Sequence, residues 1–272
     1  MAAGRRSART ERLFASQRLD EPEVGIPFSA GGDELSVVEL RQYTLQAGQR
    51  DVMIDLFDQE LVETQEAVGI RVLGQFRDLD NPNRFVWLRA FPDMSARRRA
   101  LEGFYGGPVW AAHGDAANAT MVDSDDVLLL RPTRRGSGFA LAGRTRPPAG
   151  TGPRFDSLLA ATVYSLPAPV DEEFVTFFAH RVAPEMVRTS APPVASFQTE
   201  AAENTYPALP VREGEHVFVW FASFSSEAEH RRHIEQLRRS AHWNDHVKQE
   251  LAARLASHQY LRLQPTPRSL LH

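Results

Sequence analysis

The alternation of apolar and polar side chains predicts where the ordered part of the chain begins. In the stretch LSVVELRQYTL, residues 35–45, the positions Val37, Glu39, Arg41 and Tyr43 alternate with Val38, Leu40, Gln42 and Thr44. A period of two residues is typical of a β-strand, in which successive side chains point to opposite faces. One face of this first strand would carry Val37, Glu39, Arg41 and Tyr43.

The residues that follow change their period several times. Residues 49–68 have helical spacing, and residues 69–76 and 85–91 have the pattern of two strands with a turn at 81–84 between them. The pattern then predicts a helix over 95–107 with Ser95 as its N-cap, a short helix over 109–120 and a fourth strand over 125–132. This order, strand–helix–strand–strand–helix–strand, is that of a ferredoxin-like unit, in which two helices cover one face of a four-stranded antiparallel sheet. The opposite face of the sheet is left needing a partner.

The chain then repeats this plan at constant distances. Trp87, Phe91, Trp110, His113, Leu130 and Pro132 each recur 133 residues later, at Trp220, Phe224, Trp243, His246, Leu263 and Pro265. Upstream the distance is 121 residues, from Tyr43, Phe57 and Phe76 to Tyr164, Phe178 and Phe197. The change of offset places a 12-residue insertion in the second copy, within TEAAENTYPALPVREGEH before its third strand. The sequence therefore predicts a tandem duplication.

Two such units predict an α+β fold whose sheets pack together within one chain. Each sheet alone would expose an apolar face, and burial stabilises by about 25 cal/mol per Å² of apolar surface. We expect a leader or docking arm over residues 1–34, a first unit over 35–133, a linker rich in Gly, Pro and Arg over 134–155, and a second, divergent unit over 156–272.

Composition narrows the class of protein. The 272 residues are 42% hydrophobic with a net charge of -4, which gives no basic footprint for nucleic acid. Lys248 is the only lysine, so arginine carries nearly all the positive charge, as codon usage in a GC-rich bacterial genome would produce. The chain has no cysteine, and no window reaches about 18 consecutive apolar residues. We expect a cytoplasmic protein without membrane or nucleic-acid partners.

Three stretches of the first unit resemble the NIPSNAP family. They are VVELRQYTLQAGQRD, FRDLDNPNRFVWLRAFPDMSARRRALEGFYGGPVWAAHGDAANATM and VLLLRP, within about residues 36 to 132, whereas the second unit resembles the family weakly. The resemblance implies the dimeric α/β-barrel fold, formed here by two ferredoxin-like units of one chain. Relatives in that superfamily include cofactor-independent monooxygenases, isomerases, cyclases, haem enzymes and proteins of unknown activity, so the fold leaves the function open.

A tryptophan and a histidine three residues apart occur once in each unit, as Trp110 with His113 and Trp243 with His246. Residues three apart share a helix face, so the tryptophan could line a pocket and the histidine act there as a base. The alternative is a core tryptophan beside a histidine that caps a helix. Asp115 and Asn118 of the first unit become Lys248 and Leu251 in the second, which favours the first unit as the working half.

Other candidates lie on the predicted strands. Arg41 and Tyr43 share a face with Glu39, and a buried arginine needs a carboxylate or a substrate anion. Trp87 and Arg89 share a face of the third strand, where core packing is the alternative role, and Tyr105 lies beside a glycine turn. Arg41 becomes Thr162 and Arg89 becomes Ala222 in the second unit, which again singles out the first.

These residues predict a small-molecule-binding protein, most simply an enzyme of specialised metabolism. His113, Arg41 and Tyr43 would be catalytic, and the substrate-binding residues would be Trp87, Arg89, Tyr105, Trp110, Asn118, Trp243 and His246. The chemistry would be cofactor-independent proton transfer, as in an isomerase or cyclase, or monooxygenation, in a pocket of the first unit. No cofactor is required, although superfamily analogy keeps haem on His113 or His246 open.

Metal binding, a non-catalytic role and oligomerisation are the remaining questions that the sequence raises. The histidines at 230, 233, 242 and 246 have helical spacing but lack an acidic third ligand in an established motif, so we predict no metal site. A non-catalytic interaction or scaffold protein is the alternative function. Further homo-oligomerisation is also left open.

Overall fold

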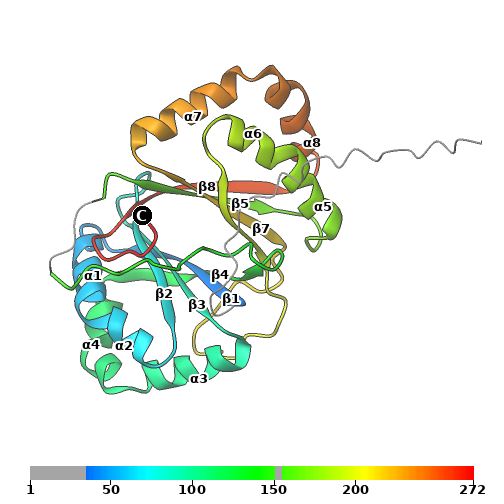
Figure 1. Ribbon diagram of the computed structural model, residues 1–272. Coiled ribbons are helices and arrows are strands. Elements are labelled where there is room, and N and C mark those ends of the chain that lie inside the picture. The colour runs from blue at the N-terminus through cyan, green and yellow to red at the C-terminus, as the bar shows by residue number, and fades with distance from the viewer. Residues whose placement is uncertain (1–34, 151–154) are drawn as a thin grey trace, which may run out of the picture.

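The structure, a computed structural model, describes residues 35–150 and 155–272, so the predicted leader lies outside the described residues. Eight strands close into one barrel in the order β1-β3-β2-β8-β5-β7-β6-β4, with antiparallel neighbours throughout (Figure 1). The strands are β1 Val37–Leu45, β2 Arg71–Asp78, β3 Arg84–Phe91, β4 Met121–Pro132, β5 Leu158–Ser165, β6 Pro193–Thr199, β7 Val217–Phe224 and β8 Ser257–Pro265. The predicted packing of two ferredoxin-like sheets into one barrel is confirmed.

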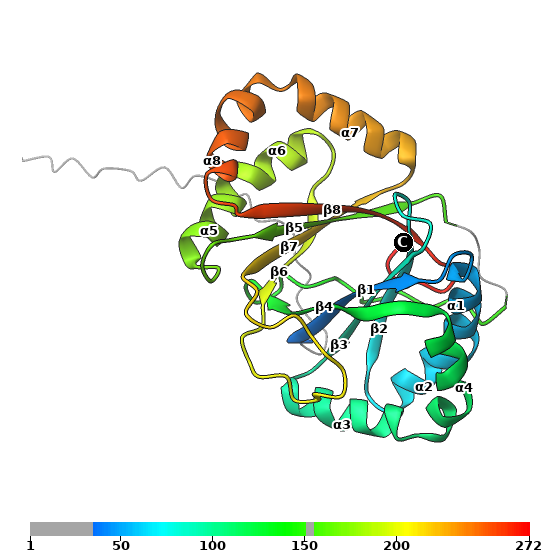
Figure 2. The same cartoon turned by 180° about the vertical axis from the view of Figure 1, so that it is seen from behind.

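The helices cover the barrel on two opposite sides, α1 to α4 on one and α5 to α8 on the other (Figures 1 and 2). The first set is α1 Arg50–Leu56, α2 Val62–Ala67, α3 Met94–Tyr105 and α4 Pro108–Ala119. The second set is α5 Glu172–Phe177, α6 Ala183–Arg188, α7 Glu227–Arg239 and α8 Lys248–Ala252. A single π-helical turn joins α1 to α2 at Phe57–Leu61 and α5 to α6 at Phe178–Val182.

Strand register confirms the duplication predicted from the sequence offsets. Glu39 pairs with Arg89 between β1 and β3, and Ala160 pairs with Ala222 at the same place between β5 and β7. The π-helical turn also recurs 121 residues later, and so does a β-bulge, after Val72 in β2 and after Pro193 in β6. The two halves therefore share their irregular features as well as their strands.

The buried apolar residues form three layers. One fills the barrel interior with side chains from both sheets, including Val38 and Leu40 of β1. The other two lie between each sheet and its helices, and we call them the first and second sheet–helix layers. Tyr43 and Trp87 belong to the first sheet–helix layer. The predicted polar face of β1 is thus turned toward the helices and away from the barrel interior.

Two local details differ from the sequence prediction. Asp93, and not Ser95, caps α3, because its carboxylate accepts a hydrogen bond from the Ala96 backbone N–H at 2.6 Å. The segment expected as a linker also contributes to the core. Phe139 packs against Phe221 of the barrel with ring centroids 4.9 Å apart. An apolar end of a barrel needs covering, and this segment supplies part of the cover.

The same segment and the C-terminal tail meet over the first unit. Arg146 Nη2 donates to Glu66 Oε1 at 2.9 Å, and Arg268 Nε donates to the Pro147 carbonyl at 3.0 Å. Arg268 also pairs with Glu63. These bonds connect both the segment before the second unit and the C-terminal tail to helix α2.

Asp58 lies buried beneath this junction and gives a prediction of pH-dependent stability. Burial raises the pKa of its carboxyl to about 6, and the charge of Arg268 only partly offsets burial. The folded protein therefore holds this proton more tightly than the unfolded chain. That contribution is fully present below the ordinary pKa of 3.8 and is lost as the pH rises through about 6.

We expect Asp58→Asn, which mimics the protonated acid, to raise the free energy of unfolding by about 3 kcal/mol above neutral pH. Below about pH 4 the variant and the wild type should be equally stable, because both then carry a neutral side chain. Urea unfolding over a pH series measures the difference, with the exposed Asp55→Asn on the same helix as control. A difference that does not vary with pH would refute the assignment.

Candidate functional site

Glu39 is the centre of a buried charge cluster in the first sheet–helix layer. Its Oε2 accepts hydrogen bonds from Arg41 Nη1 at 2.6 Å and Arg89 Nε at 2.7 Å, and its Oε1 accepts one from Arg97 Nε at 2.6 Å. All four side chains are at most 1% exposed. We call these four residues the Glu39 cluster. One carboxylate faces three guanidinium groups, so two positive charges remain in excess.

The fold explains why these residues meet. Glu39 and Arg41 lie on the helix-facing side of β1, and strand register places Arg89 of β3 directly opposite Glu39. Arg97 lies in the first turn of α3, on the same buried side as Ala100, Leu101 and Phe104. The turn after β3 therefore carries α3 back over its own sheet and brings the third arginine onto the carboxylate.

Polar and aromatic side chains surround the cluster. Tyr43 Oη accepts from Arg41 Nε at 2.9 Å, and Gln65 Oε1 and Tyr105 Oη accept from Arg89 Nη1 at 3.3 and 3.4 Å. The guanidinium carbons of Arg41 and Arg89 lie 5.5 and 5.1 Å from the centroid of the Trp87 ring. The tryptophan face thus adds a cation–π contact to each of these arginines.

The charges decide the protonation states at the site. Burial alone would raise the pKa of the Glu39 carboxyl, but the charges of Arg89, Arg41 and Arg97 together outweigh burial and hold that pKa well below its usual range. Burial raises the pKa of the Tyr43 phenol despite the neighbouring Arg41. At neutral pH Glu39 is therefore an ionised acceptor and Tyr43 a neutral hydroxyl, and neither is suited to abstract a proton.

Two donors of the cluster have no acceptor among the described residues. They are Nη2 of Arg89 and Nη2 of Arg97, both fully buried. Buried polar groups in proteins are nearly always hydrogen-bonded, and an excess of buried positive charge is costly. Charged oxygen atoms are the strongest acceptors for guanidinium groups. The cluster therefore has the chemistry of a site for a small anion.

The second half has no such cluster. Ala160, Thr162, Met186, Ala222 and His230 occupy the positions of Glu39, Arg41, Gln65, Arg89 and Arg97. Burial lowers the pKa of His230, and its Nε2 lies 2.8 Å from Tyr260 Oη. The asymmetry seen in Arg41 and Arg89 thus extends to the whole cluster, and the second sheet–helix layer holds an uncharged equivalent.

The sequence-predicted residues of the first unit divide into two groups. Arg41, Tyr43, Trp87, Arg89 and Tyr105 come together in and around the cluster. Trp110 lies at the rim, since its ring packs on that of Tyr105 with centroids 4.8 Å apart. His113 and Asn118 lie further along α4, where Asn118 is exposed.

His113 is 34% exposed, and its Nε2 lies 3.7 Å from Glu60 Oε2. The imidazole thus faces an acidic side chain on the outer surface of the layer and makes no described hydrogen bond to the Glu39 cluster. Its assignment as a base stays a prediction. A substrate held by Arg89 would have to extend past Tyr105 and Trp110 to reach it.

The residues predicted in the second unit do not belong to this site. Trp243 packs in the second sheet–helix layer, and His246 is exposed beside His242 with ring centroids 5.4 Å apart. That layer lies across the barrel from α3 and α4 (Figure 1). The structure therefore does not bring Trp243 and His246 together with Arg41, because the barrel fold places the equivalent helices on opposite sides.

Sequence reasoning missed Arg97 and Gln65 and did not recognise Glu39 as the common acceptor. Two signals were available. Glu39 becomes Ala160 at the same offset at which Arg41 becomes Thr162, so the acid and its arginines are lost together. Arg97 also falls on the apolar face of its helix.

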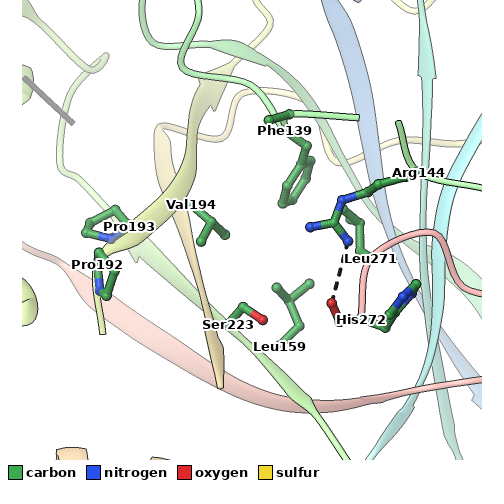
Figure 3. A pocket seen from close by; sticks show the side chains of 10 residues that line it. Phe139, Arg144, Leu159, Pro192, Pro193, Val194, Ser223, Leu271 and His272 are labelled. Atoms are coloured by element: carbon green, nitrogen blue, oxygen red, sulfur yellow. Dashed lines mark hydrogen bonds between the residues drawn. The ribbon is translucent and has the colours of Figure 1, made fainter. Parts of the chain in front are cut away.

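A separate cavity of about 270 Å³ lies at one end of the barrel (Figure 3). Its walls are mainly apolar, and its lining includes Phe139, Leu159, Pro193 and Leu271. The guanidinium of Arg144 in this wall donates to the Leu270 carbonyl at 2.9 Å. The residues predicted from the sequence as catalytic or substrate-binding do not line this cavity.

No group of three or more His, Asp or Glu side chains in residues 35–150 and 155–272 is arranged to hold a metal ion. No helix in this part of the chain has the length and apolar character needed to cross a membrane.

Comparison with known proteins identifies the half that carries the cluster. Residues 38–135 match the NIPSNAP family model. We call the matched residues the NIPSNAP domain. The region matched by the family model contains the whole Glu39 cluster and ends before the second unit. A search among curated proteins gives no match. The NIPSNAP domain is thus joined to a diverged copy of the same fold.

Solved structures similar to the whole chain share its fold. A candidate monooxygenase from Lactobacillus acidophilus is 12% identical, with a TM-score of 0.50 over 85% of this chain and 94% of its own. One from Fusobacterium nucleatum is 10% identical, with a TM-score of 0.52 over 85% and 93%. An anthrone oxidase-like protein is 12% identical, with a TM-score of 0.53 over 86% and 92%. At such identities the likeness shows a dimeric α/β barrel in one chain, with the NIPSNAP domain as one half.

Proposed function

We propose that the protein binds a small organic anion beside the Glu39 cluster and acts on it as a cofactor-independent enzyme, by proton transfer or by oxygenation. The observation that carries the proposal is the set of three buried arginines around one glutamate, with an unpaired Nη2 on Arg89 and on Arg97. The second unit, with the same backbone, has none of these charges.

The chemistry follows from the excess positive charge. Removing a proton from an acidic carbon or a phenol creates an anion, and preorganised donors in a buried site stabilise such an anion strongly. Arg89 and Arg97 would supply these donors, while Trp87 and Trp110 exclude water. Because the pKa of Glu39 is low, we assign the base to His113 on the outer surface of the layer, beyond Trp110, with Glu60 beside its imidazole.

The comparisons support this class of reaction. The structures of similar fold include two candidate monooxygenases and an anthrone oxidase-like protein. A cofactor-independent reaction of this class would begin with loss of a proton from an acidic organic substrate. An arginine-rich site suits the ionised form.

The proposal is tested by measuring thermal stability with paired ligands that differ only in charge, such as benzoate and benzamide. We expect anions to stabilise the wild type by about 2.7 kcal/mol at one hundred times their dissociation constant, and the neutral partners to have no effect. Arg89→Ala, which copies Ala222, should lose the response, and the exposed Arg98→Ala should keep it. Equal stabilisation by both members of every pair would count against an anion site.

Catalysis is read separately from binding. Exchange of an acidic C–H proton of a bound anion with deuterated solvent, followed by NMR, reports proton abstraction without knowledge of the product. His113→Gln should slow this exchange by about 10²- to 10⁴-fold and leave anion binding unchanged. Unchanged exchange in that variant would show that His113 is not the base.

A further inference from the structure

The 12-residue insertion of the second unit reaches the first unit. The connection between β6 and β7 spans residues 200–216, whereas its counterpart between β2 and β3 spans only 79–83. Figure 2 shows this segment in yellow, extending from the barrel to the beginning of α3. We call residues 200–216 the crossing segment.

The middle of the crossing segment touches the Glu39 cluster directly. Arg97 Nη1 donates to Asn204 Oδ1 at 3.0 Å and to Thr205 Oγ1 at 3.3 Å. Tyr206 stacks on Tyr105, with ring centroids 6.0 Å apart and planes at 22°. Asn204, Thr205 and Tyr206 thus lie against Arg97 and Tyr105, the two α3 side chains at the cluster.

The ends of the segment are held to β4 by backbone hydrogen bonds, whereas its middle is held mainly through side chains: Asn204 Nδ2 donates to the Leu209 carbonyl at 2.9 Å and Thr205 Oγ1 to the Met94 carbonyl at 3.2 Å. The backbone N–H groups of Glu200 and Arg212 donate to the carbonyls of Leu129 and Val127 on β4, both at 2.9 Å. The Arg212 guanidinium also donates to Asp126 at 3.1 Å. Between these anchors the chain forms no helix or strand. Segments with few backbone bonds and fixed ends are those that open locally at low cost.

We propose that the crossing segment is the gate of the anion site, and that Asn204 and Thr205 hold Arg97 in place of the ligand. This inference rests on the proposed function. Asn204 and Thr205 offer neutral oxygen atoms, whereas a carboxylate or phenolate forms stronger, charge-assisted bonds with a guanidinium. A bound anion therefore competes for Arg97, and separation of Tyr206 from Tyr105 opens the way in.

The gate also assigns a role to the second unit. That unit has lost the charges of the cluster but has gained the segment that covers it. The residues of this segment contact the ligand from the solvent side in the closed state. Asn204, Thr205 and Tyr206 are then specificity residues that the NIPSNAP domain does not itself contain.

Phenylglyoxal, which modifies arginine side chains and is the size of a small aromatic substrate, tests the gate without knowledge of the ligand. In the full-length wild type we expect Arg97 to react slowly and the exposed Arg98 to react fast. The double variant Asn204→Ala/Thr205→Ala should raise the rate at Arg97 by about tenfold, because the closed state loses two bonds to a charged group. Mass spectrometry with peptide fragmentation gives the rate at each arginine.

Two controls and a second opening variant make the result decisive. Glu213→Ala changes an exposed side chain of the same segment and should leave the rate at Arg97 unchanged. Arg268 is buried away from the segment, so a simultaneous rise at Arg268 would indicate general unfolding and overturn the proposal. Tyr206→Ala is a second opening variant, for which we expect a similar rise. An unchanged rate at Arg97 in both variants also overturns the gate.

The gate and the proposed function fail in different ways. If benzoate stabilises the wild type but the variants leave the rate at Arg97 unchanged, the anion site stands and the gate is refuted. If the variants expose Arg97 but benzoate does not stabilise the wild type, the segment is a cover over a structural cluster, and both proposals fail.

Discussion

Replacing Glu39 by alanine should lower the free energy of unfolding by about 3–5 kcal/mol at neutral pH. The substitution leaves Arg41, Arg89 and Arg97 buried side by side without their common carboxylate. Breaking a buried ion pair is costly because the remaining charge has neither water nor a partner. Urea unfolding of wild type and variant measures the loss. Glu66→Ala, which removes the partner of Arg146 from a partly exposed pair, is the matched control and should cost less.

A small carboxylate should rescue the variant. Formate or acetate can enter the space left by the Glu39 side chain and restore an acceptor to the three guanidinium groups. We expect the melting temperature of Glu39→Ala to rise with formate concentration, beyond the effect of chloride at equal ionic strength. If formate and chloride act alike, the variant is not destabilised by its three uncompensated cations. If the variant is as stable as the wild type, Glu39 does not stabilise the fold by compensating them.

Removing Arg97, in contrast, should weaken anion binding but leave the stability of the fold nearly unchanged. Arg97→Met keeps the aliphatic stem and removes one of two excess positive charges, so we expect stability within about 1 kcal/mol of the wild type. Affinity for an organic anion should fall by about 10- to 100-fold, as loss of a hydrogen bond to a charged group predicts. Loss of binding without loss of stability is the mark of a residue retained for function.

The comparison with Arg98→Met makes this prediction specific. Arg98 is the next residue along α3, is 63% exposed and pairs with Glu102, so its replacement should change neither stability nor affinity. Calorimetric titration with benzoate and urea unfolding give the two quantities for each variant. If Arg97→Met loses 3 kcal/mol or more, the third arginine is part of the structural framework, and the anion site is refuted.

Periodicity and internal repetition predicted the architecture from the sequence because they depend only on spacing along the chain. The offsets of 121 and 133 residues placed the insertion in the loop before β7, where the crossing segment is found. The alternation along β1 placed Glu39, Arg41 and Tyr43 on one face. It could not show whether that face meets the helices or the other sheet, since both environments are buried.

The composition of the cluster was harder to predict, because it depends on packing between elements. Arg97 reaches Glu39 only because α3 folds back over β1 and β3, and no spacing rule relates residues 39 and 97. For the same reason, spacing could not show how Trp110 and His113 lie relative to the cluster. Three-residue spacing places the two side chains on one face of α4, but only Gly114 and Ala117 of that helix are fully buried.

The crossing segment could be located from the sequence but not assigned a function. Its composition, with Glu, Asn, Pro and Gly, is typical of an exposed loop. Nothing in that composition indicates that Asn204 and Thr205 accept hydrogen bonds from an arginine more than one hundred residues earlier. Duplication explains the division of roles, since one copy could lose its charges once the other retained them.

A crystal structure of the wild-type protein with bound 4-bromobenzoate tests the central claim most directly, because bromine can be located by its anomalous signal. We predict a carboxylate within hydrogen-bonding distance, about 2.7–2.9 Å, of Nη2 of Arg89 or Arg97. The bromine should lie on the side of Tyr105 and Trp110, with the Tyr206 ring displaced. A ligand found instead in the cavity at the end of the barrel beside Arg144, with the Glu39 cluster unchanged, would contradict the account.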